Sequence, residues 1–302
     1  MEKSKKLSFS GHETFYCRHY WLKKGYDFIN NKHRFTEPEA VVHLGVGKNM
    51  VTSIAFWMKA FGVLDENNKL TRLADFLFKA TGRDPYLEDT GSFWLLHYFL
   101  VKTGRASIYS LFFNEFRKER IEFNRLHLES FIQRKCLENG QKISDNTIKK
   151  DVAVFLRNYL RPRGKKIVIE DDFSAILIDL DLIQELSVVD GSVHNWYVVK
   201  NMQREEIPKE IILFAILDSN HGENSISFQK LLNDYNSVGN IFALSANGLL
   251  TKIEEITACY PEIVFTDDAG IKELQLRKRF NKWKILENYY EDEVFAIRQH
   301  RA

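Results

Sequence analysis

Apolar residues recur at helical spacing between residues 36 and 80, and glycines and short polar turns separate the runs. This pattern predicts the order helix, turn, helix, hairpin, helix, which is typical of a winged helix-turn-helix. The predicted pieces are a helix over 37–44 capped by Thr36, a break at 45–47, a helix over 48–61, strands at 63–64 and 69–71, and a helix over 71–79.

A second pair of helices follows within the first half, either as another helix-turn-helix or as plain bundle packing. Helices are predicted at 127–139 and 147–160, and Pro162 and Gly164 then interrupt the helical pattern and mark a boundary between domains 1–165 and 166–302. Beyond it we expect strands at 167–169 and 196–199, mixed signals over 173–186, helices at 209–219, 227–233 and 240–257, and a hairpin over 263–276. The predicted fold class is mainly α with small β elements (α+β), with one winged module in each half.

Composition places the chain among ordinary globular proteins, with 302 residues, 44% of them hydrophobic and 28% charged. Its longest apolar runs are far shorter than the roughly 20 residues of a membrane helix, and no apolar signal core follows the basic start, so a cytoplasmic protein without membrane contact is expected. Cys17, Cys136 and Cys259 are too widely spaced for a CxxC zinc site and too few for a disulfide framework.

Charge is distributed unevenly between the two halves. Residues 1–165 hold 29 Lys and Arg against 18 Asp and Glu, a balance of +11, whereas the rest holds 14 against 23, a balance of −9. Double-stranded DNA would therefore meet the basic N-terminal half, because positive potential attracts phosphates and phosphate contacts release counterions. The alternative is that the asymmetry only marks two domains with different surfaces.

Candidate DNA contacts lie at the start of the helix over 48–61. Lys48, Asn49 and Ser53 follow a glycine turn, where exposed N–H groups and polar side chains can meet a phosphate or a base edge. The turn lacks the GxxxxGK[ST] pattern of a nucleotide-binding loop. A tight turn in a module for protein contacts is the alternative. Further candidates for phosphate contacts in this half are Arg18, Lys23, Lys24, Arg161 and Arg163.

Two segments offer catalytic chemistry. His12 and Glu13 could form an acid–base pair if a turn brings them to one site, and a structural role is the alternative. Asp84, Glu88 and Asp89, with His97 following, could hold Mg²⁺ or Mn²⁺ and activate water against a phosphodiester. Acidic capping of the next helix explains the same carboxylates without a metal and is preferred. Tyrosine nucleophiles at Tyr16, Tyr20 or Tyr86 are a competing route.

Four segments in order resemble a bacterial family catalogued as a domain of unknown function. They are residues 9–15 (FSGHETF), 44–50 (LGVGKNM), 84–89 (DPYLED) with 94–97 (WLLH), and 151–156 (DVAVFL). The family occurs in gene clusters for phage defence and DNA phosphorothioation, and its best-described members are SspB-like proteins. The resemblance implies DNA binding and single-strand nicking that admits sulfur, alongside a cysteine desulfurase, an ATPase and a sulfotransferase-like partner.

Three hypotheses follow from these observations. The first is a nickase of a phosphorothioation system, and the second is a non-catalytic DNA-binding adaptor that recruits the sulfur-transfer enzymes. Convergence of the six candidate catalytic residues favours the nickase, whereas carboxylates that cap separate helices favour the adaptor. The third is a regulator that binds only protein, which predicts no salt-dependent DNA affinity. A homodimer is compatible with all three.

Overall fold

Small polar residues stand directly before many of the helices and cap them. A backbone N–H in the first helical turn donates a hydrogen bond to the side chains of Thr71, Asp89, Asn124, Ser144, Ser227, Ser237 and Ser245. Glycines in the left-handed conformation end other helices, with φ of 59° at Gly45 and 61° at Gly104. Many helix boundaries are therefore set by local sequence.

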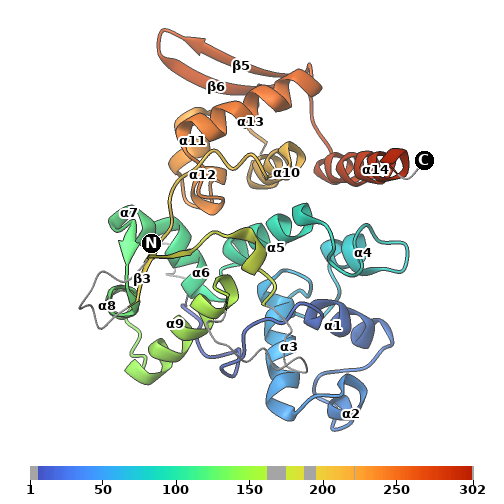
Figure 1. The fold of residues 1–302 in the computed structure, drawn as a ribbon, viewed down its shortest axis with the longest axis vertical. Helices are drawn as coiled ribbons and strands as arrows, with labels where there is room; N and C mark the ends of the chain where they lie inside the picture. The colour runs from blue at the N-terminus through green and yellow to red at the C-terminus, as the bar shows by residue number, and fades with distance from the viewer. Residues whose placement is uncertain (1–5, 162–174, 187–194, 221, 301–302) are drawn as a thin grey trace. The chain divides into compact units, whose positions relative to one another are not determined.

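The computed structural model describes residues 6–161, 175–186, 195–220 and 222–300 (Figure 1). The chain divides into two compact units, Met1–Lys200 and Asn201–Ala302. Both units are rich in helix, and each contains a three-stranded antiparallel sheet. The chain is thus a mixed α/β protein, about half helical with small antiparallel sheets.

The N-terminal unit is built mostly from short helices. Its elements are α1 (Trp21–Asn30), α2 (Ala40–Leu44), α3 (Lys48–Ala60), α4 (Arg72–Phe78), α5 (Thr90–Thr103), α6 (Ser107–Leu111), the π-helical turn η1 (Phe112–Phe116), α7 (Arg117–Glu119), β1 (Glu122–Phe123), α8 (Arg125–Glu138), α9 (Asp145–Tyr159), the 3₁₀ turn η2 (Ile178–Leu180), β2 (Gln184–Leu186) and β3 (Trp196–Val198).

Aromatic side chains fill the core of this unit. The π-helical turn η1 buries Phe112, Phe113 and Phe116, and the ring centroids of Phe112 and Phe155 lie 4.6 Å apart. Phe116 meets Phe123 edge to face at 5.3 Å. This core joins η1 to β1 and α9 and makes a rigid base for the surface elements.

The small sheet of the N-terminal unit has the order β1-β3-β2. Phe123 of β1 pairs with Tyr197 of β3, and Glu185 of β2 pairs with Tyr197 from the other side. This long-range pairing joins residues 184–186 and 196–198 to the N-terminal unit. The units therefore divide after Lys200, not at the proline- and glycine-containing segment 161–166, most of which lies outside the described residues.

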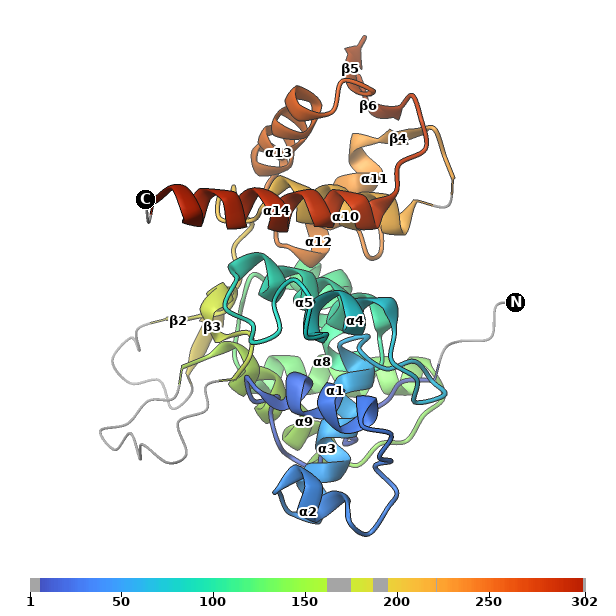
Figure 2. The ribbon, with the colours of Figure 1, turned by 90° about the vertical axis from the view of Figure 1, so that its right-hand side faces the viewer.

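The C-terminal unit surrounds the apolar helix α10. Its elements are α10 (Lys209–Ser219), β4 (Ser225–Ser227), α11 (Phe228–Asn233), α12 (Val238–Ile241), α13 (Ala246–Cys259), β5 (Ile263–Asp268), β6 (Ile271–Leu276) and α14 (Lys282–His300). Figure 2 shows α14 running beside α10, where the rings of Phe214 and Trp283 meet at 5.3 Å. The sheet order is β4-β6-β5, so β4 pairs with the far strand of the β5–β6 hairpin.

Several predicted elements are confirmed and some need correction. The predicted helix over 48–61 is α3, and the predicted hairpin over 263–276 is β5–β6. The helix predicted from residue 37 begins only at Ala40, and the strands predicted at 63–64 and 69–71 reduce to a single bridge between Leu64 and Leu70. The helix predicted over 240–257 is two helices, because Ala243 has φ of 52° and breaks the run.

Other elements were not predicted from the sequence, among them α1, the run α6–η1–α7, β1, β4 and α14. The predicted strand at 167–169 lies outside the described residues. Within the described part of the chain, no helix has both the length and the apolar character that crossing a bilayer requires.

Candidate functional site

The N-terminal motif segment binds to α9 and α6 through polar contacts of its backbone. Ser8 N–H donates to Ser107 Oγ at 2.9 Å, and Ser10 N–H donates to both carboxylate oxygens of Asp151 at 3.0 and 3.2 Å. Cys17 N–H donates to Asn158 Oδ1 at 3.1 Å. Two of the four motif segments, 9–15 and 151–156, therefore meet at Asp151.

His12 lies inside this contact and is only 2% exposed. Its Nε2 is 3.1 Å from Asp151 Oδ1, and its Nδ1 accepts a hydrogen bond from Thr14 N–H at 3.2 Å. Because Nδ1 acts as an acceptor, the neutral ring carries its proton on Nε2, facing the carboxylate. The ring also stacks on Trp57, with an interplanar angle of 13°. Nδ1 is hydrogen-bonded, and Nε2 is buried beside the carboxylate without forming a hydrogen bond, so the His12 ring is packed inside the fold and does not face solvent.

Glu13 does not share a site with His12. Ser10, Glu13 and Thr14 have φ of 62°, 48° and 69°, a left-handed conformation that non-glycine residues rarely adopt. This turn buries the His12 side chain and leaves Glu13 exposed. At Gly11 a Cβ would lie 2.4 Å from the Phe56 ring, so the turn also needs a glycine for close approach. The turn brings the pair into one loop but onto different sides of it.

Two carboxylates of the 84–89 loop, those of Asp84 and Asp89, bind backbone groups, whereas Glu88 is exposed. Asp84 Oδ1 accepts from Glu88 N–H at 2.8 Å, and its Oδ2 accepts from Asp89 N–H at 3.1 Å. Asp89 is the N-cap of α5 and accepts from Ser92 N–H at 3.2 Å. These contacts match the capping interpretation. The described residues contain no group of three or more His, Cys, Asp or Glu side chains that could hold a metal ion.

His97 is a core residue of α5. Its side chain is fully buried, its Nδ1 lies 3.0 Å from Tyr159 Oη, and Phe113 meets its ring edge to face. Burial raises the pKa of Tyr159 well above its ordinary value, so the hydroxyl keeps its proton and can donate it to Nδ1. His12 contacts Asp151, His97 contacts Tyr159, the Asp84 and Asp89 carboxylates bind backbone N–H groups, and Glu88 is exposed. The catalytic candidates thus have separate surroundings.

The α3 helix presents two of its three candidate DNA contacts. Lys48 and Asn49 are exposed at its first turn, whereas Ser53 is fully buried and cannot reach DNA in this conformation. The prediction that Ser53 contacts DNA is thus corrected. Ser53 lies one helical turn before the buried Trp57, so both side chains share the face that packs into the core. Thr52 is exposed instead. The N-cap is Gly47, which has no side-chain cap hydrogen bond.

The other basic candidates are partly engaged. Lys23 Nζ binds the Asp27 carboxylate at 2.5 and 2.7 Å, and Lys24 Nζ donates to Leu44 O at 3.0 Å. The Arg18 guanidinium lies 5.5 Å from the centre of the Trp21 ring. Arg161 pairs with Asp179 at 2.9 Å, and both side chains are largely exposed, so a phosphate could compete for this weak pair. Arg163 lies outside the described residues.

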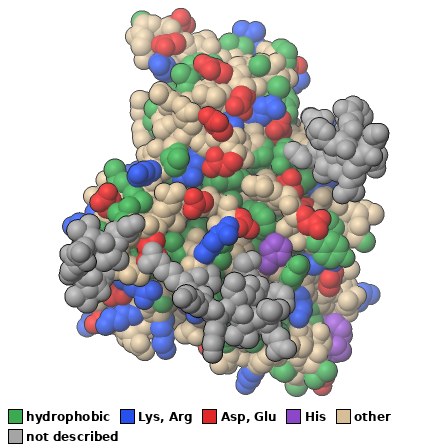
Figure 3. All heavy atoms as spheres, viewed as in Figure 1, with side chains coloured by type: hydrophobic (Ala, Val, Ile, Leu, Met, Phe, Trp, Pro, Cys, Tyr) green, Lys and Arg blue, Asp and Glu red, His purple; other side chains and the backbone are tan. Residues whose placement is uncertain are grey.

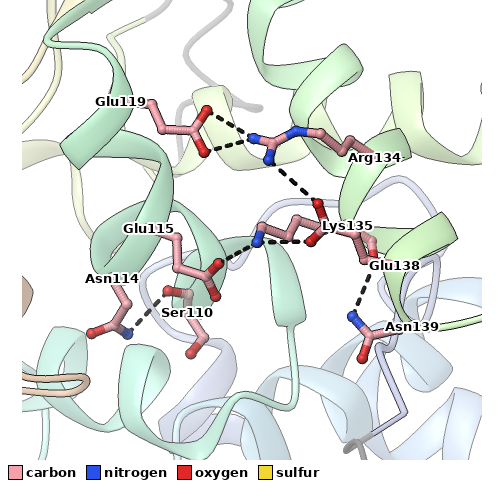
Figure 4. Close-up of polar contacts among 8 residues, drawn as sticks. All are labelled: Ser110, Asn114, Glu115, Glu119, Arg134, Lys135, Glu138 and Asn139. Atoms are coloured by element: carbon pink, nitrogen blue, oxygen red, sulfur yellow. Dashed lines mark hydrogen bonds and ion pairs between the residues drawn. The ribbon is translucent and has the colours of Figure 1, made fainter.

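An ion-pair network on α8 neutralises other basic residues of the N-terminal unit (Figure 4). Arg134 binds both carboxylate oxygens of Glu119 at 2.6 and 2.8 Å, and Lys135 contacts Glu115 at 2.7 Å and Glu138 at 2.9 Å. The hydrogen bond from Lys135 lowers the pKa of Glu138, which keeps the pair ionised at neutral pH. The positive balance of this half is therefore not all available to phosphate.

Comparisons with known proteins agree with the motif pattern. A family model described as "Protein of unknown function (DUF4007)" matches residues 9–290. Two solved structures, "Magnesium ion-bound SspB crystal structure" and "SspB crystal structure", are each 27% identical to this chain, cover 94% of it over 88% of their own length, and have TM-scores of 0.80 and 0.79. The comparison with curated proteins gave no match. Because the family model spans all four motif segments, the SspB-like resemblance is confirmed and the chain belongs to the DUF4007 family.

Proposed function

We propose that this chain is a DNA-binding component of a phosphorothioation and phage-defence system, and that α3 reads or grips the duplex. The observation that carries the proposal is the open first turn of α3, where Lys48 and Asn49 are exposed. No atom lies within 4 Å of a Cβ built on Gly45 or Gly47, so the turn before α3 leaves room for a DNA backbone.

The order of elements supports a winged helix-turn-helix in this unit. Helix α2, the Gly45–Gly47 turn and α3 are followed by the antiparallel Leu64–Leu70 bridge and then by α4. In such modules the second helix of the pair enters the major groove and the hairpin flanks it. Arg18, Lys23, Lys24 and Arg161 are the further phosphate contacts in this proposal.

The C-terminal unit supports a second winged module with another partner. Its order α10, β4, α11, α12, α13, β5, β6 and its sheet order β4-β6-β5 support that architecture. The exposed positions Glu254 on α13 and Asp267 and Asp268 at the hairpin tip are acidic. Residues 201–302 hold 12 Lys and Arg against 16 Asp and Glu, and this net negative balance disfavours a polyanion, so the module is proposed to contact protein, such as the cysteine desulfurase, ATPase or sulfotransferase-like partner.

Nicking is the second candidate activity, and similarity to a magnesium-bound SspB structure favours it. The predicted ligand set does not fit a metal here, since both Asp84 oxygens accept backbone N–H groups and Asp89 caps α5. Their capping role favours the adaptor role over the nickase.

Duplex binding at several salt concentrations tests the main proposal. In the double variant Lys48→Ala, Asn49→Ala we expect weaker binding, and each lost phosphate contact should reduce the slope of log affinity against log salt by about one. Lys272→Ala, an exposed lysine of β6, is the control and should bind as the wild type does. Unchanged affinity and slope in the double variant would remove α3 from the interface.

A further inference from the structure

An open groove lies between α1, the end of α2 and the 84–89 loop, all within the N-terminal unit. Its volume is about 470 Å³, within the range of roughly 300–1,000 Å³ that is typical of small-ligand sites. We call it the Tyr20–Tyr86 groove, after the two aromatic residues at its sides. The side chains that the argument uses are those of Tyr20, Lys23, Lys24, His33, His43 and Tyr86.

Two large aromatic side chains of this groove face solvent. Tyr20 is 49% exposed and Tyr86 is 61% exposed. Most aromatic residues of the unit are buried in its core, so these two stand out as surface available for stacking. Exposed tyrosines offer a wide flat area at a low cost in side-chain entropy, because only two torsions need to be fixed.

The backbone around Tyr86 is fixed from both sides. Tyr86 O lies 3.0 Å from His19 Nε2, and the buried Asp84 carboxylate binds the N–H groups of Glu88 and Asp89. Leu87 is buried and has a left-handed φ of 56°. Such strain persists only where the surroundings determine it, and it tends to accumulate at functional sites. The Asp84 carboxylate and His19 therefore fix the backbone that carries the exposed Tyr86 ring.

The charges of the groove suit a single phosphate better than a long polyanion. Lys23 Nζ is 6.0 Å from the centre of the Tyr86 ring, but its charge is balanced by Asp27. Lys24 is anchored on Leu44 O and has no acidic partner in this contact. The stacked rings of His33 and His43, 4.0 Å apart, add a further flat surface. The groove thus offers flat rings on which one base could stack and one lysine, Lys24, that could bind one phosphate.

We propose that the Tyr20–Tyr86 groove binds an unpaired nucleotide of DNA, with the base stacked on Tyr86 and Tyr20 and its phosphate near Lys24. The inference rests on the proposed DNA-binding function and extends it to opened or single-stranded DNA. His43 lines the groove and Lys48 begins α3 five residues later, so the groove adjoins the proposed duplex contact. Stacking on an aromatic side chain contributes about 1–3 kcal/mol per base.

The test compares two probes bound by the full chain. One is a duplex with an unpaired central stretch that carries 2-aminopurine, and the other is the same duplex fully paired. We expect Tyr86→Ala to weaken binding of the opened probe by roughly 10-fold or more and to leave paired-duplex affinity within about 2-fold. Stacking should quench 2-aminopurine fluorescence in the wild type and in Tyr86→Phe, and the quench should be lost in Tyr86→Ala.

Tyr235→Ala is the matched control, because Tyr235 is a 57% exposed tyrosine of the C-terminal unit. The proposal is overturned if Tyr86→Ala binds the opened probe as the wild type does, or if it loses both probes equally. Competition by free thymidine monophosphate with no preference for the opened probe would assign the groove to a free nucleotide instead. If the wild type binds neither probe, the proposed DNA-binding function fails as well, whereas duplex binding with an unaffected Tyr86 variant removes only the groove.

Discussion

Buried carboxylates hold the backbone at two points of the N-terminal unit. Asp151 accepts from Ser10 N–H and faces His12, and Asp84 accepts two N–H groups of its own loop. Hydrogen bonds to charged groups contribute about 1.5–3 kcal/mol each, and removal of one partner leaves a buried group unsatisfied. Both residues therefore act by fixing the segments that carry His12 and Tyr86.

Two substitutions of Asp89 distinguish a capping role of its side chain from a metal-binding role. Asp89→Ala should lower the free energy of unfolding by about 1 kcal/mol, because Ser92 N–H loses its acceptor at the start of α5. Asp89→Ser restores a cap and should recover most of that loss in urea titrations. Serine supplies no carboxylate, so any chelator-sensitive relaxation of supercoiled plasmid by the wild type should survive in Asp89→Ser. Loss of nicking at unchanged stability would return Asp89 to the catalytic candidates.

For single residues, the sequence identifies candidate side chains more readily than the side chains they contact. It singles out His12, but its partner Asp151 is far away in the chain and becomes its neighbour only when the N-terminal segment crosses α9. The burial of Ser53 follows from helical spacing, since it shares a face with Trp57. The sequence suggests Tyr86 only as a possible nucleophile. Its exposure on a fixed loop depends on the hydrogen bonds of Asp84 and His19, which the local sequence does not reveal.

Helix α3 offers a test in which stability and binding change in opposite directions. Gly47, its N-cap, has φ of −66° and room for a side chain. Gly47→Asp should raise the free energy of unfolding by about 0.3–1 kcal/mol, through capping and the helix dipole, yet weaken duplex binding by repelling phosphate. Gly47→Ser is the control that caps without charge and should bind DNA more tightly than Gly47→Asp. Equal DNA affinity of the aspartate and serine variants would mean that no phosphate approaches this turn.

Element prediction succeeded where local signals are strong. Ser227 before α11, the glycine turn before α3 and the Asp-Asp-Ala-Gly turn at 267–270 between β5 and β6 all mark their elements in the sequence. The long helix α14 was missed because Lys282–His300 mixes charged and aromatic residues without a clear apolar stripe. The break between α12 and α13 depends on contacts of Met202 with Ala243 and Ser245, which local patterns do not reveal.

At the scale of the whole chain, surface charge is mixed on the face that Figure 3 shows, where Lys and Arg side chains alternate with Asp and Glu. On this face no continuous basic patch is seen, so DNA binding through it would depend on individual basic and polar side chains. The predicted domain boundary was based on the change in charge balance and on Pro162. The N-terminal unit instead extends to Lys200, because β3 pairs with β1 far away in the chain.

The division after Lys200 predicts how the two units behave apart. A fragment over 201–302 contains 12 Lys and Arg against 16 Asp and Glu, a balance of −4, and carries its own apolar helix α10 and its own sheet. It should therefore unfold cooperatively by circular dichroism and fail to retain duplex DNA at physiological salt, while a fragment over 1–200 retains DNA. Arg277 and Arg279 are exposed near the hairpin, and Lys278 there pairs with Glu262. Tight duplex binding by the 201–302 fragment would show that these local cations outweigh the net charge, and the proposed division between DNA and protein contacts would be wrong.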